Sequence, residues 1–191
     1  MNSRSFTLSA DKRLNIIKLQ IGVAETLSSG EMPKKEDVKV FWAVWDSGAT
    51  KSCISQVVVD TLGLEPVNRV NVHTGAGIEQ KDEFIVDMFL PNNIRFTPIR
   101  ATQINANTHI GFDCVIGMDI ISQGDMSLSN VEGKTLFSFR VPSIGGVDFV
   151  KEHNKNLQNK KKPQKVKVVT ANRNKMCHCG SGKKFKNCCA T

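Results

Sequence analysis

Short runs of apolar residues, separated by turn-forming residues, make up the chain as far as about Pro142. Apolar and polar residues that alternate over a few positions are typical of β-strands with one buried face. The pattern predicts strands over residues 14–24, 38–45, 83–90, 94–104 and 112–116, and a closing hairpin over 126–129 and 135–140. Several short strands at this spacing indicate an all-β sandwich or a closed barrel.

Two short helices interrupt this pattern. Ser55 can cap a helix that runs to Leu62, and Gly63 follows at the place where a left-handed residue often ends a helix. A second helical turn follows the strand over 112–116 and ends near Gly124.

The pattern changes beyond Val150. Residues 151–165 contain a single aliphatic side chain, Leu157, which is too little apolar surface to offset the entropy of ordering the segment. The sequence therefore predicts a globular domain over residues 1–145, a flexible basic linker over 146–174 and a compact cysteine-rich module over 175–191.

The distribution of charge supports this division. Residues 151–191 contain twelve Lys or Arg and one acid, Glu152, whereas residues 1–150 carry a net charge of −3. The apolar runs are far shorter than the roughly 18 residues of a membrane-spanning helix. The first residues also lack the basic start and apolar core of a secretory signal. We therefore expect a cytoplasmic protein with no membrane partner.

One carboxylate in the domain indicates chemistry. In Val44-Trp45-Asp46-Ser47-Gly48-Ala49-Thr50 an apolar strand leads to an acid that precedes a hydroxyl residue and a glycine. Gly48 permits a tight turn that brings the carboxylate near backbone N–H groups, and the Ser47 hydroxyl can hold one copy of the turn against another.

The chemistry suggested by this turn is peptide hydrolysis without a metal. That reaction needs a base to activate water and an acid to protonate the leaving nitrogen, and two carboxylates that share one proton supply both. The chain contains one Asp-Ser/Thr-Gly turn. The second carboxylate must then come from Asp46 of another copy across a two-fold axis, so the sequence predicts a homodimer.

A second segment completes a family resemblance. Val115-Ile116-Gly117-Met118-Asp119-Ile120-Ile121 follows about seventy residues downstream of the first. Together with the Asp46 turn and the helix that ends in Leu62-Gly63-Leu64, it makes roughly residues 10–142 resemble the retropepsin family of aspartic proteases, especially the enzymes of retrotransposons and their bacterial relatives. The resemblance implies a closed β-barrel of the acid-protease type with two short helices.

The resemblance also implies roles for individual residues. Asp46 would be catalytic, Ser47 and Gly48 would support its turn, and Ala49 would line the substrate cleft. The flap that closes over a bound peptide would carry the remaining substrate-binding residues, Thr74, Gly75, Ala76 and Gly77. Viral retropepsins usually have Arg at the position of Met118 and often an acid at that of Thr50. The loss of both here favours the retrotransposon-like branch.

Other reactive side chains in the domain have structural interpretations. Asp119 begins a helical turn, where an acid caps free backbone N–H groups, and Asp113 is interpreted as a turn or surface carboxylate. Cys53 and Cys114 lie in apolar runs without an adjacent histidine. We interpret both as small buried hydrophobic side chains rather than nucleophiles.

The C-terminal module contains four closely spaced cysteines, Cys177, Cys179, Cys188 and Cys189. Four thiolates make a closed tetrahedral site for one structural zinc ion per chain. In a reducing cytoplasm metal binding is favoured over disulfides, and a tail this short has no core on which to fold without the metal. His178 lies between two of these ligands and could compete for the ion.

This segment resembles the SEC-C module, a small zinc-binding unit known from the C-terminus of the protein-translocation ATPase SecA and from many bacterial proteins. The shared residues are Cys177-x-Cys179-Gly-Ser-Gly-Lys-Lys, Phe185 and the final Cys188-Cys189. The resemblance implies docking to protein partners, such as a translocation chaperone or the ribosome. The neighbouring lysines could add a salt-dependent attraction to RNA.

Two functional hypotheses follow. The leading one is a homodimeric cytoplasmic aspartic endopeptidase, in which paired Asp46 residues activate water and the zinc module docks to partners. The alternative is a protease-like dimer that holds peptides without cleaving them while its tail contacts a chaperone, the ribosome or RNA. A nucleic-acid-binding protein driven by the basic tail is a third hypothesis, which the acidic first domain disfavours.

Overall fold

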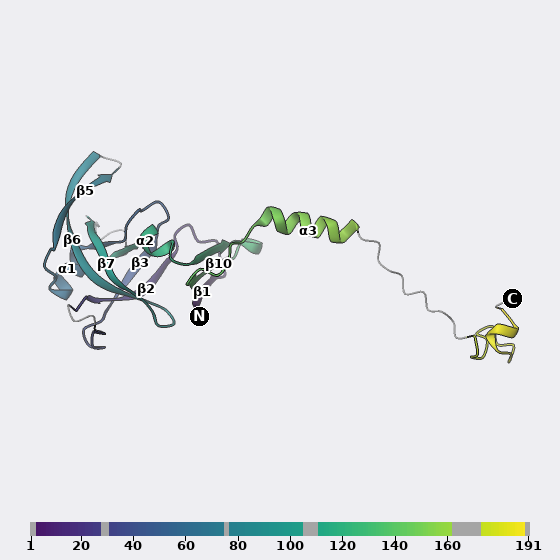
Figure 1. Cartoon of the computed structure of the whole chain (residues 1–191). Coiled ribbons are helices and arrows are strands. Elements are labelled where there is room, and N and C mark those ends of the chain that lie inside the picture. Colours follow the sequence, from purple (N-terminus) through teal and green to yellow (C-terminus); the bar gives the residue numbers. More distant parts are fainter. Residues whose placement is uncertain (1–2, 28–30, 75–76, 105–110, 162–172, 190–191) are drawn as a thin grey trace. The chain divides into compact units, whose positions relative to one another are not determined.

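The computed structural model describes residues 3–27, 31–74, 77–104, 111–161 and 173–189. The chain divides into two compact units, Met1–Gly146 and Val147–Thr191 (Figure 1). Within the described residues, no helix is long and apolar enough to cross a membrane.

Six strands of the first unit close into a barrel. Their order is β2 (Lys18–Glu25), β3 (Lys39–Trp45), β8 (Cys114–Ile116), β4 (Cys53–Ser55), β7 (Ile94–Ile104) and β6 (Gly77–Leu90), and β6 pairs with β2 to complete the ring. A further strand, β5 (Asn68–Thr74), pairs with β6 to form a long hairpin. The closed all-β barrel expected from the sequence is confirmed.

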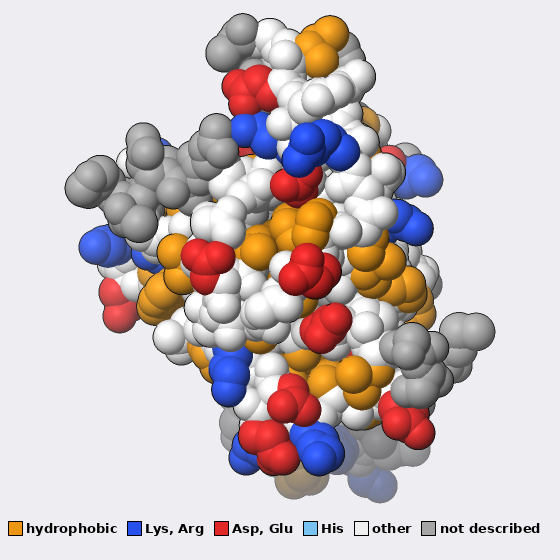
Figure 2. Space-filling view, turned by 90° about the vertical axis from the view of Figure 1, so that its left-hand side faces the viewer, with side chains coloured by type: hydrophobic (Ala, Val, Ile, Leu, Met, Phe, Trp, Pro, Cys, Tyr) orange, Lys and Arg blue, Asp and Glu red, His pale blue; other side chains and the backbone are white. Residues whose placement is uncertain are grey.

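The barrel interior is built from the apolar positions of alternating strands. Val23, Ala43, Ile54 and Val86 are all completely buried there. In β2 and β3, buried positions alternate with more exposed ones over residues 18–23 and 41–45, as the pleat of a strand predicts. β8 is buried along its whole length. This explains why the sequence of β8 is an unbroken apolar run, since both of its faces are covered. On the outside of the unit, the face with α1 (Gln56–Leu62) and β5 shows acidic side chains among apolar and basic ones (Figure 2).

A three-stranded antiparallel sheet packs against the barrel. Its order is β1 (Arg4–Ala10), β10 (Thr135–Val141) and β9 (Asp125–Ser129). Phe6, Phe137 and Phe139 lie side by side on its inner face and surround Trp45 at the end of β3, with 4.9 Å between the ring centroids of Trp45 and each of the last two. The sheet therefore packs directly against the residue that precedes Asp46.

The two helices predicted for this unit are present. α1 ends at Gly63, whose φ of +62° is the left-handed conformation expected there. α2 (Met118–Ile121) follows β8. The hairpin of β9 and β10 turns through Glu132 and Gly133, which both have positive φ.

Three strands were not predicted, namely β1, β4 and β5. Each is short or rich in polar residues. β1 and β4 become strands through pairing with distant segments, as Phe6 of β1 does with Phe139, whereas β5 pairs with the neighbouring β6. Such pairing leaves little trace in the local pattern.

The second unit begins with a helix, within the segment 146–174 that the sequence predicted to be a flexible basic linker. α3 (Phe149–Lys161) starts at Asp148, whose carboxylate accepts a hydrogen bond from the Lys151 amide (3.0 Å). The expectation failed because it considered only the lack of apolar surface. Lys, Glu, Gln and Leu all have high helix propensity, and Asp148 is a good N-cap.

Candidate active site

Asp46 lies directly after β3, at the point where β8 also ends. β3 and β8 run parallel, with Trp45 opposite Ile116, and the Asp46 amide donates a hydrogen bond to the Ile116 carbonyl (3.0 Å). On its other side β8 pairs with β4, the strand that leaves the turn. One buried central strand therefore holds both ends of the Asp46 turn.

Hydrogen bonds inside the turn orient the Asp46 carboxylate. The Gly48 amide donates to its Oδ1 atom (2.8 Å), and the Ala49 amide donates to the Asp46 carbonyl (3.2 Å). A Cβ atom on Gly48 would lie 3.1 Å from the same Oδ1, so glycine leaves room for the carboxylate. Asp46, Ser47 and Gly48 are exposed in the single chain, and the carboxylate is therefore open to water and ligands.

A buried hydrogen-bond cluster braces the far end of the turn. The amide and hydroxyl of Ser52, which is fully buried, donate to the Asp119 carboxylate at 2.7–3.0 Å. The same hydroxyl accepts a hydrogen bond from the Gly117 amide (3.0 Å), and the Met118 amide donates to the Ala49 carbonyl (2.8 Å). Asp119 thus has a structural role, as expected, and connects α2 to the Asp46 turn.

Gly117 is required by this arrangement. A Cβ atom at this position would lie 2.4 Å from the carbonyl carbon of Lys51 and 2.5 Å from its oxygen. Any side chain would therefore push α2 away from the turn. Sequence analysis selected Gly117 but missed Ser52, because a lone serine gives no local signal of a partner 67 positions away.

A hollow of about 420 Å³ opens beside the carboxylate. Asp46 and Ser47 form part of its wall, together with Trp45, Phe112 and Phe137. Three of its apolar lining residues are largely exposed: Ile16 (59%), Leu128 (50%) and Met126 (41%). The carboxylate thus adjoins apolar surface that a single chain leaves open to water. The role of β9 in this surface was not predicted.

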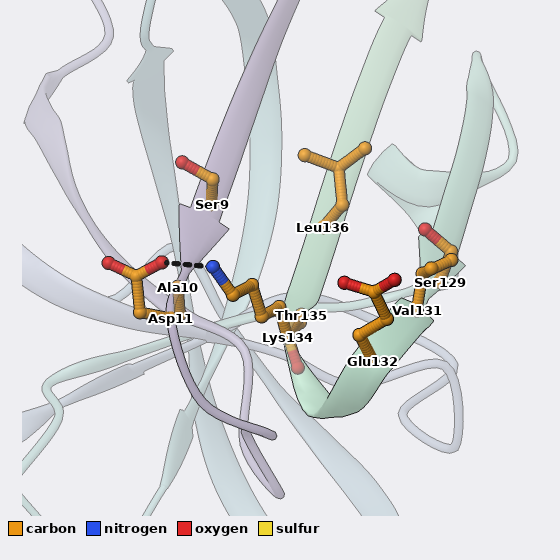
Figure 3. A pocket seen from close by; sticks show the side chains of 9 residues that line it. All are labelled: Ser9, Ala10, Asp11, Ser129, Val131, Glu132, Lys134, Thr135 and Leu136. Atoms are coloured by element: carbon orange, nitrogen blue, oxygen red, sulfur yellow. Dashed lines mark ion pairs between the residues drawn. The ribbon is translucent and has the colours of Figure 1, made fainter.

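A second, smaller hollow of about 320 Å³ lies at the ends of β1 and β9 (Figure 3). Ser9, Ser129 and Leu136 line it, and Lys134 forms an ion pair with Asp11 at 3.2 Å. The Asp11 side chain is almost fully exposed. Exposed ion pairs of this kind contribute little to stability.

The four cysteines of the C-terminal unit converge. The Sγ atoms of Cys177, Cys179, Cys188 and Cys189 all lie within 4.8 Å of one another. Local turns bring them together, because the Gly180 amide donates to the Cys177 carbonyl (3.3 Å) and the Cys177 amide donates to the Lys183 carbonyl (2.7 Å).

The electrostatics of this cluster suit a bound dication. Hydrogen bonding with Cys177 and the other sulfurs raises the pKa of Cys189 to about 12, so several thiolates cannot coexist without a compensating charge. A hydrogen bond from Ser181 lowers the pKa of Cys179 to about 6. Four converging sulfurs are the donor set of structural zinc. The His178 ring instead lies beside that of Phe185, with 5.6 Å between centroids.

Comparison with known proteins identifies both regions. Residues 37–123 match the family model described as "gag-polyprotein putative aspartyl protease", and residues 173–191 match the model described as "SEC-C motif". Among solved structures, the chain is similar to a retropepsin-like aspartic protease from Rickettsia conorii. That similarity has a TM-score of 0.45 and 8% sequence identity, and covers 74% of this chain and 97% of that chain.

Residues 37–123, the larger part of the first unit, are similar to the aspartyl protease family. The matched residues include the Asp46 turn, α1, β8 and the Gly117–Asp119 segment. The second family match includes all four converging cysteines. Both resemblances stated from the sequence are thereby confirmed.

In the retropepsin-like unit, the predicted flap corresponds to the hairpin of β5 and β6. Thr74 ends β5 opposite Gly77, which begins β6 and has a φ of +129° that favours glycine. Gly75 and Ala76 lie outside the described residues. The assignment of this tip and of Ala49 to substrate binding stays a prediction.

A buried carboxylate links the Asp46 turn to this hairpin. Glu83 of β6 accepts hydrogen bonds from Lys51 Nζ (3.1 Å) and from Arg100 Nη1 (2.9 Å). Burial acts to raise the pKa of Glu83, but the two cationic partners outweigh it and hold that pKa below its ordinary value. The ion pairs fix Lys51, and with it the end of the turn, against the hairpin.

Two other sets of residues in the retropepsin-like unit were singled out from the sequence. Thr50 and Met118, which replace the viral ion pair, are both exposed. Of the two thiols, Cys114 is buried as interpreted, whereas Cys53 is half-buried. Burial raises the pKa of Cys53 to about 11 and also raises that of Cys114. Both thiols therefore stay protonated near neutral pH, which does not suit a nucleophile.

Proposed function

We propose that the chain is a homodimeric aspartic endopeptidase in which Asp46 of each copy forms half of the catalytic pair. The carrying observation is the exposed Asp46 carboxylate in a rigidly braced turn of a retropepsin-like unit. Because the chain has one such turn, a second copy is the source of the second carboxylate.

The paired carboxylates would hold one proton between them, since two such groups about 3 Å apart cannot both ionise. The ionised carboxylate removes a proton from water as the water oxygen attacks the peptide carbonyl carbon. The protonated one gives its proton to the carbonyl oxygen. Transfer of a proton to the nitrogen then lets the C–N bond break, and an acid and an amine leave.

The rest of the turn would support this chemistry without taking part in proton transfer. Gly48 holds Oδ1 of Asp46 through its amide, and Ser47 would contact the other copy of the turn. Ala49 and the hairpin tip, with Thr74, Gly75, Ala76 and Gly77, would hold the peptide backbone. These roles are supported by the match of residues 37–123, which include all of these positions, to the aspartyl protease family model.

We also propose one structural zinc ion per chain, held by Cys177, Cys179, Cys188 and Cys189. The convergence of their sulfurs supports this, and a reducing compartment such as the cytoplasm would keep the thiols available. The module would dock to a chaperone, the ribosome or RNA. Its described residues include exposed Arg173, Lys175, Lys183, Lys184 and Lys186, which would favour an acidic partner.

Digestion of a peptide library by wild type and by Asp46→Asn tests the enzyme directly. We expect wild type to cleave peptides best at acidic pH, and the variant to fold and leave the library intact. Equal cleavage by both would overturn the assignment of Asp46. Retention of peptides by wild type without turnover at any pH would support the non-catalytic adaptor instead.

A further inference from the structure

Two basic side chains share one buried carboxylate between the Asp46 turn and the hairpin of β5 and β6. Lys51 Nζ lies 3.1 Å from Glu83 Oε1, and Arg100 Nη1 lies 2.9 Å from Glu83 Oε2. The Glu83 side chain is only 3% exposed, whereas those of Lys51 and Arg100 are 50% and 58% exposed. Both carboxylate oxygens of this Glu83 cluster are thus in use, and both of its cations still face water.

The Glu83 cluster has more positive than negative charge, because two cations accompany one carboxylate. Among the residues that the structure describes, neither cation has a second ion-pair partner. One cation would be enough to balance Glu83, so the pairing of this carboxylate does not explain why two are present. Residues 1–150 carry a net charge of −3. The excess positive charge is therefore local to the cluster.

On one side the cluster belongs to the Asp46 turn. Lys51 follows Asp46 by five positions. Burial raises the pKa of the Cys53 thiol, the carboxylates of Asp119 and Asp46 add to this effect, and the Lys51 ammonium acts against it. The charges of Asp46 and Lys51 thus both act on the same thiol. Lys51 therefore lies close to the half-site that Asp46 provides.

On the other side the cluster belongs to the hairpin. Glu83 stands on β6, six positions after Gly77 at the hairpin tip, and Arg100 stands on β7 opposite Ile85 of β6. The proposed function places a peptide between this tip and the Asp46 turn. Each residue of an extended peptide advances by about 3.3 Å. Side chains a few positions from the cleaved bond would therefore pass a cluster that joins the turn to the hairpin.

We propose that Lys51 and Arg100 form a subsite that binds the carboxylate of an Asp or Glu side chain of the substrate peptide. This inference rests on the proposed function, because the peptide is the substrate of that enzyme. The bound carboxylate would complete a neutral group of two cations and two carboxylates with Glu83. Its hydrogen bonds to an ammonium and a guanidinium are charge-assisted, and such bonds are stronger than those of a neutral side chain.

The proposed homodimer would contain two of these subsites. A two-fold axis relates them, so one lies on each side of the bond that is cleaved. We therefore expect acidic side chains to be favoured at matching positions before and after that bond.

The first test measures kcat/KM for pairs of peptides that differ only by Glu or Gln at one position, which is scanned along both sides of the cleaved bond. The peptides are made with an amidated and with a free C-terminus, because a terminal carboxylate is a second group that two cations can hold. At the preferred positions we expect wild type to cleave the amidated Glu peptide about fivefold more efficiently than the Gln peptide, or more. A ratio near one at every position, or a preference only for free C-termini, would overturn the subsite.

Substitutions assign the preference to the cluster. Lys51→Met and Arg100→Met should each lower the Glu/Gln ratio toward one, whereas Lys134→Met should leave it as in wild type. Lys134 is the matched control, because its side chain is 60% exposed and forms an ion pair with Asp11 at 3.2 Å. The ratio compares two peptides with one enzyme, so a smaller folded fraction of a variant does not change it. Wild-type ratios in both cluster variants, or an equal fall in Lys134→Met, would contradict the assignment.

A pH series on wild type tests the charge without any substitution. Burial acts to raise the pKa of Glu83, but its two cationic partners hold that pKa below its ordinary value. Glu83 therefore becomes protonated at lower pH than the peptide glutamate, whose ordinary pKa is about 4.3. The preference for Glu over Gln should be present above about pH 4.3 and disappear below it, as the peptide carboxyl is protonated. A ratio that is constant between about pH 6 and about pH 3 would contradict a carboxylate ligand.

Binding measurements separate this inference from the proposed function. Asp46→Asn should bind the labelled Glu peptide more tightly than the Gln peptide by a similar ratio, as measured by fluorescence anisotropy without turnover. This binding preference, in a protein whose wild type cleaves no peptide, would refute the endopeptidase and leave the subsite standing. Cleavage by wild type without any preference for Glu over Gln would refute the subsite and leave the endopeptidase standing.

Discussion

The Asp46 site and the cysteine cluster are built in opposite ways. The contacts that hold the Asp46 turn join residues 67 positions apart and depend on a closed barrel, yet they position a single carboxylate, which in the proposed enzyme is half of a catalytic pair. The four cysteines lie within thirteen positions and supply a full donor set, yet they have almost no core around them. In the first region packing positions the proposed half-site, and in the second a metal would have to take the place of packing.

The largest expected effect is on the chemistry of the first region. Asp46→Asn should lower peptide turnover by roughly 10³-fold or more, because the loss of a general acid–base group commonly costs 10²–10⁴ in rate. The barrel should be unaffected, since the carboxylate is exposed. Single-turnover kinetics beside a thermal melt would check both statements. A lowered melting temperature would show instead that Asp46 holds the fold.

Metal removal should have the opposite pattern: it should unfold the cysteine module and leave the barrel folded. Chelation should abolish the fold of residues 173–189, since a module with no core depends on its metal, and should leave the thermal transition of the barrel in place. Backbone amide spectra of both units would follow this. Cys177→Ser should behave like the chelated protein, and Cys53→Ser, in the barrel, should still bind one zinc ion per chain.

A glycine substitution should break the packing of the first region. Gly117→Ala places a Cβ atom 2.4 Å from the Lys51 backbone, so we expect the free energy of unfolding to fall by about 3 kcal/mol, with loss of turnover. Gly146→Ala is the control, since a Cβ there meets nothing within 4 Å. Similar denaturation midpoints for the two variants would contradict the close approach of α2 and the turn.

Loss of the buried Ser52 hydroxyl should lower the free energy of unfolding by a smaller amount. Ser52→Ala removes the hydrogen bond to Asp119 and the acceptor for the Gly117 amide. Because that amide is left buried without a partner, we expect a loss of about 1–2 kcal/mol. The loss in the free energy of unfolding is measured by urea denaturation of wild type and variant. Ser47→Ala, at an exposed position of the same turn, should leave the free energy of unfolding of the monomer unchanged.

The smallest effect concerns the end of the first unit. Hydrogen bonds from Ser143, from the Ile144 amide and from Arg140 hold the pKa of Asp125 well below its ordinary value of 3.8. The folded pKa is lower than the unfolded one, so the stabilisation is present above pH 3.8 and is lost as pH falls toward the folded pKa. Asp125→Asn should therefore flatten the fall in melting temperature in that acidic range. An unchanged slope of melting temperature against pH would contradict the role of these hydrogen bonds to Asp125.

Much of the fold followed from local pattern, and the exceptions have physical causes. Strands with strong alternation or an unbroken apolar run, such as β3 and β8, were predicted because their burial is visible in each stretch alone. β1 was missed because Phe6 and Leu8 are only partly buried, and it pairs with β10, more than 120 positions away. α3 was missed for the opposite reason: its helix propensity is local, and the lack of apolar residues was given too much weight.

The residues of the candidate site likewise divide into those that the sequence could reveal and those that it could not. Asp46, Gly48, Gly117 and the four cysteines could be selected from sequence, because their chemistry depends on residue type and close spacing. Ser52, Glu83 and the exposed apolar face of β9 could not, because each matters only through a distant partner.

By itself the sequence determined which residues are candidates for chemistry: one Asp-Ser-Gly turn, for which a second copy is proposed, and one set of four thiols. The tertiary structure decided how the turn is held and which surface adjoins it. The hydrogen bonds between Ser52 and Asp119, and the hollow that both β9 and the Asp46 turn line, arise when the barrel brings distant segments together. A linear pattern records which side chains prefer burial, but not which neighbours they meet.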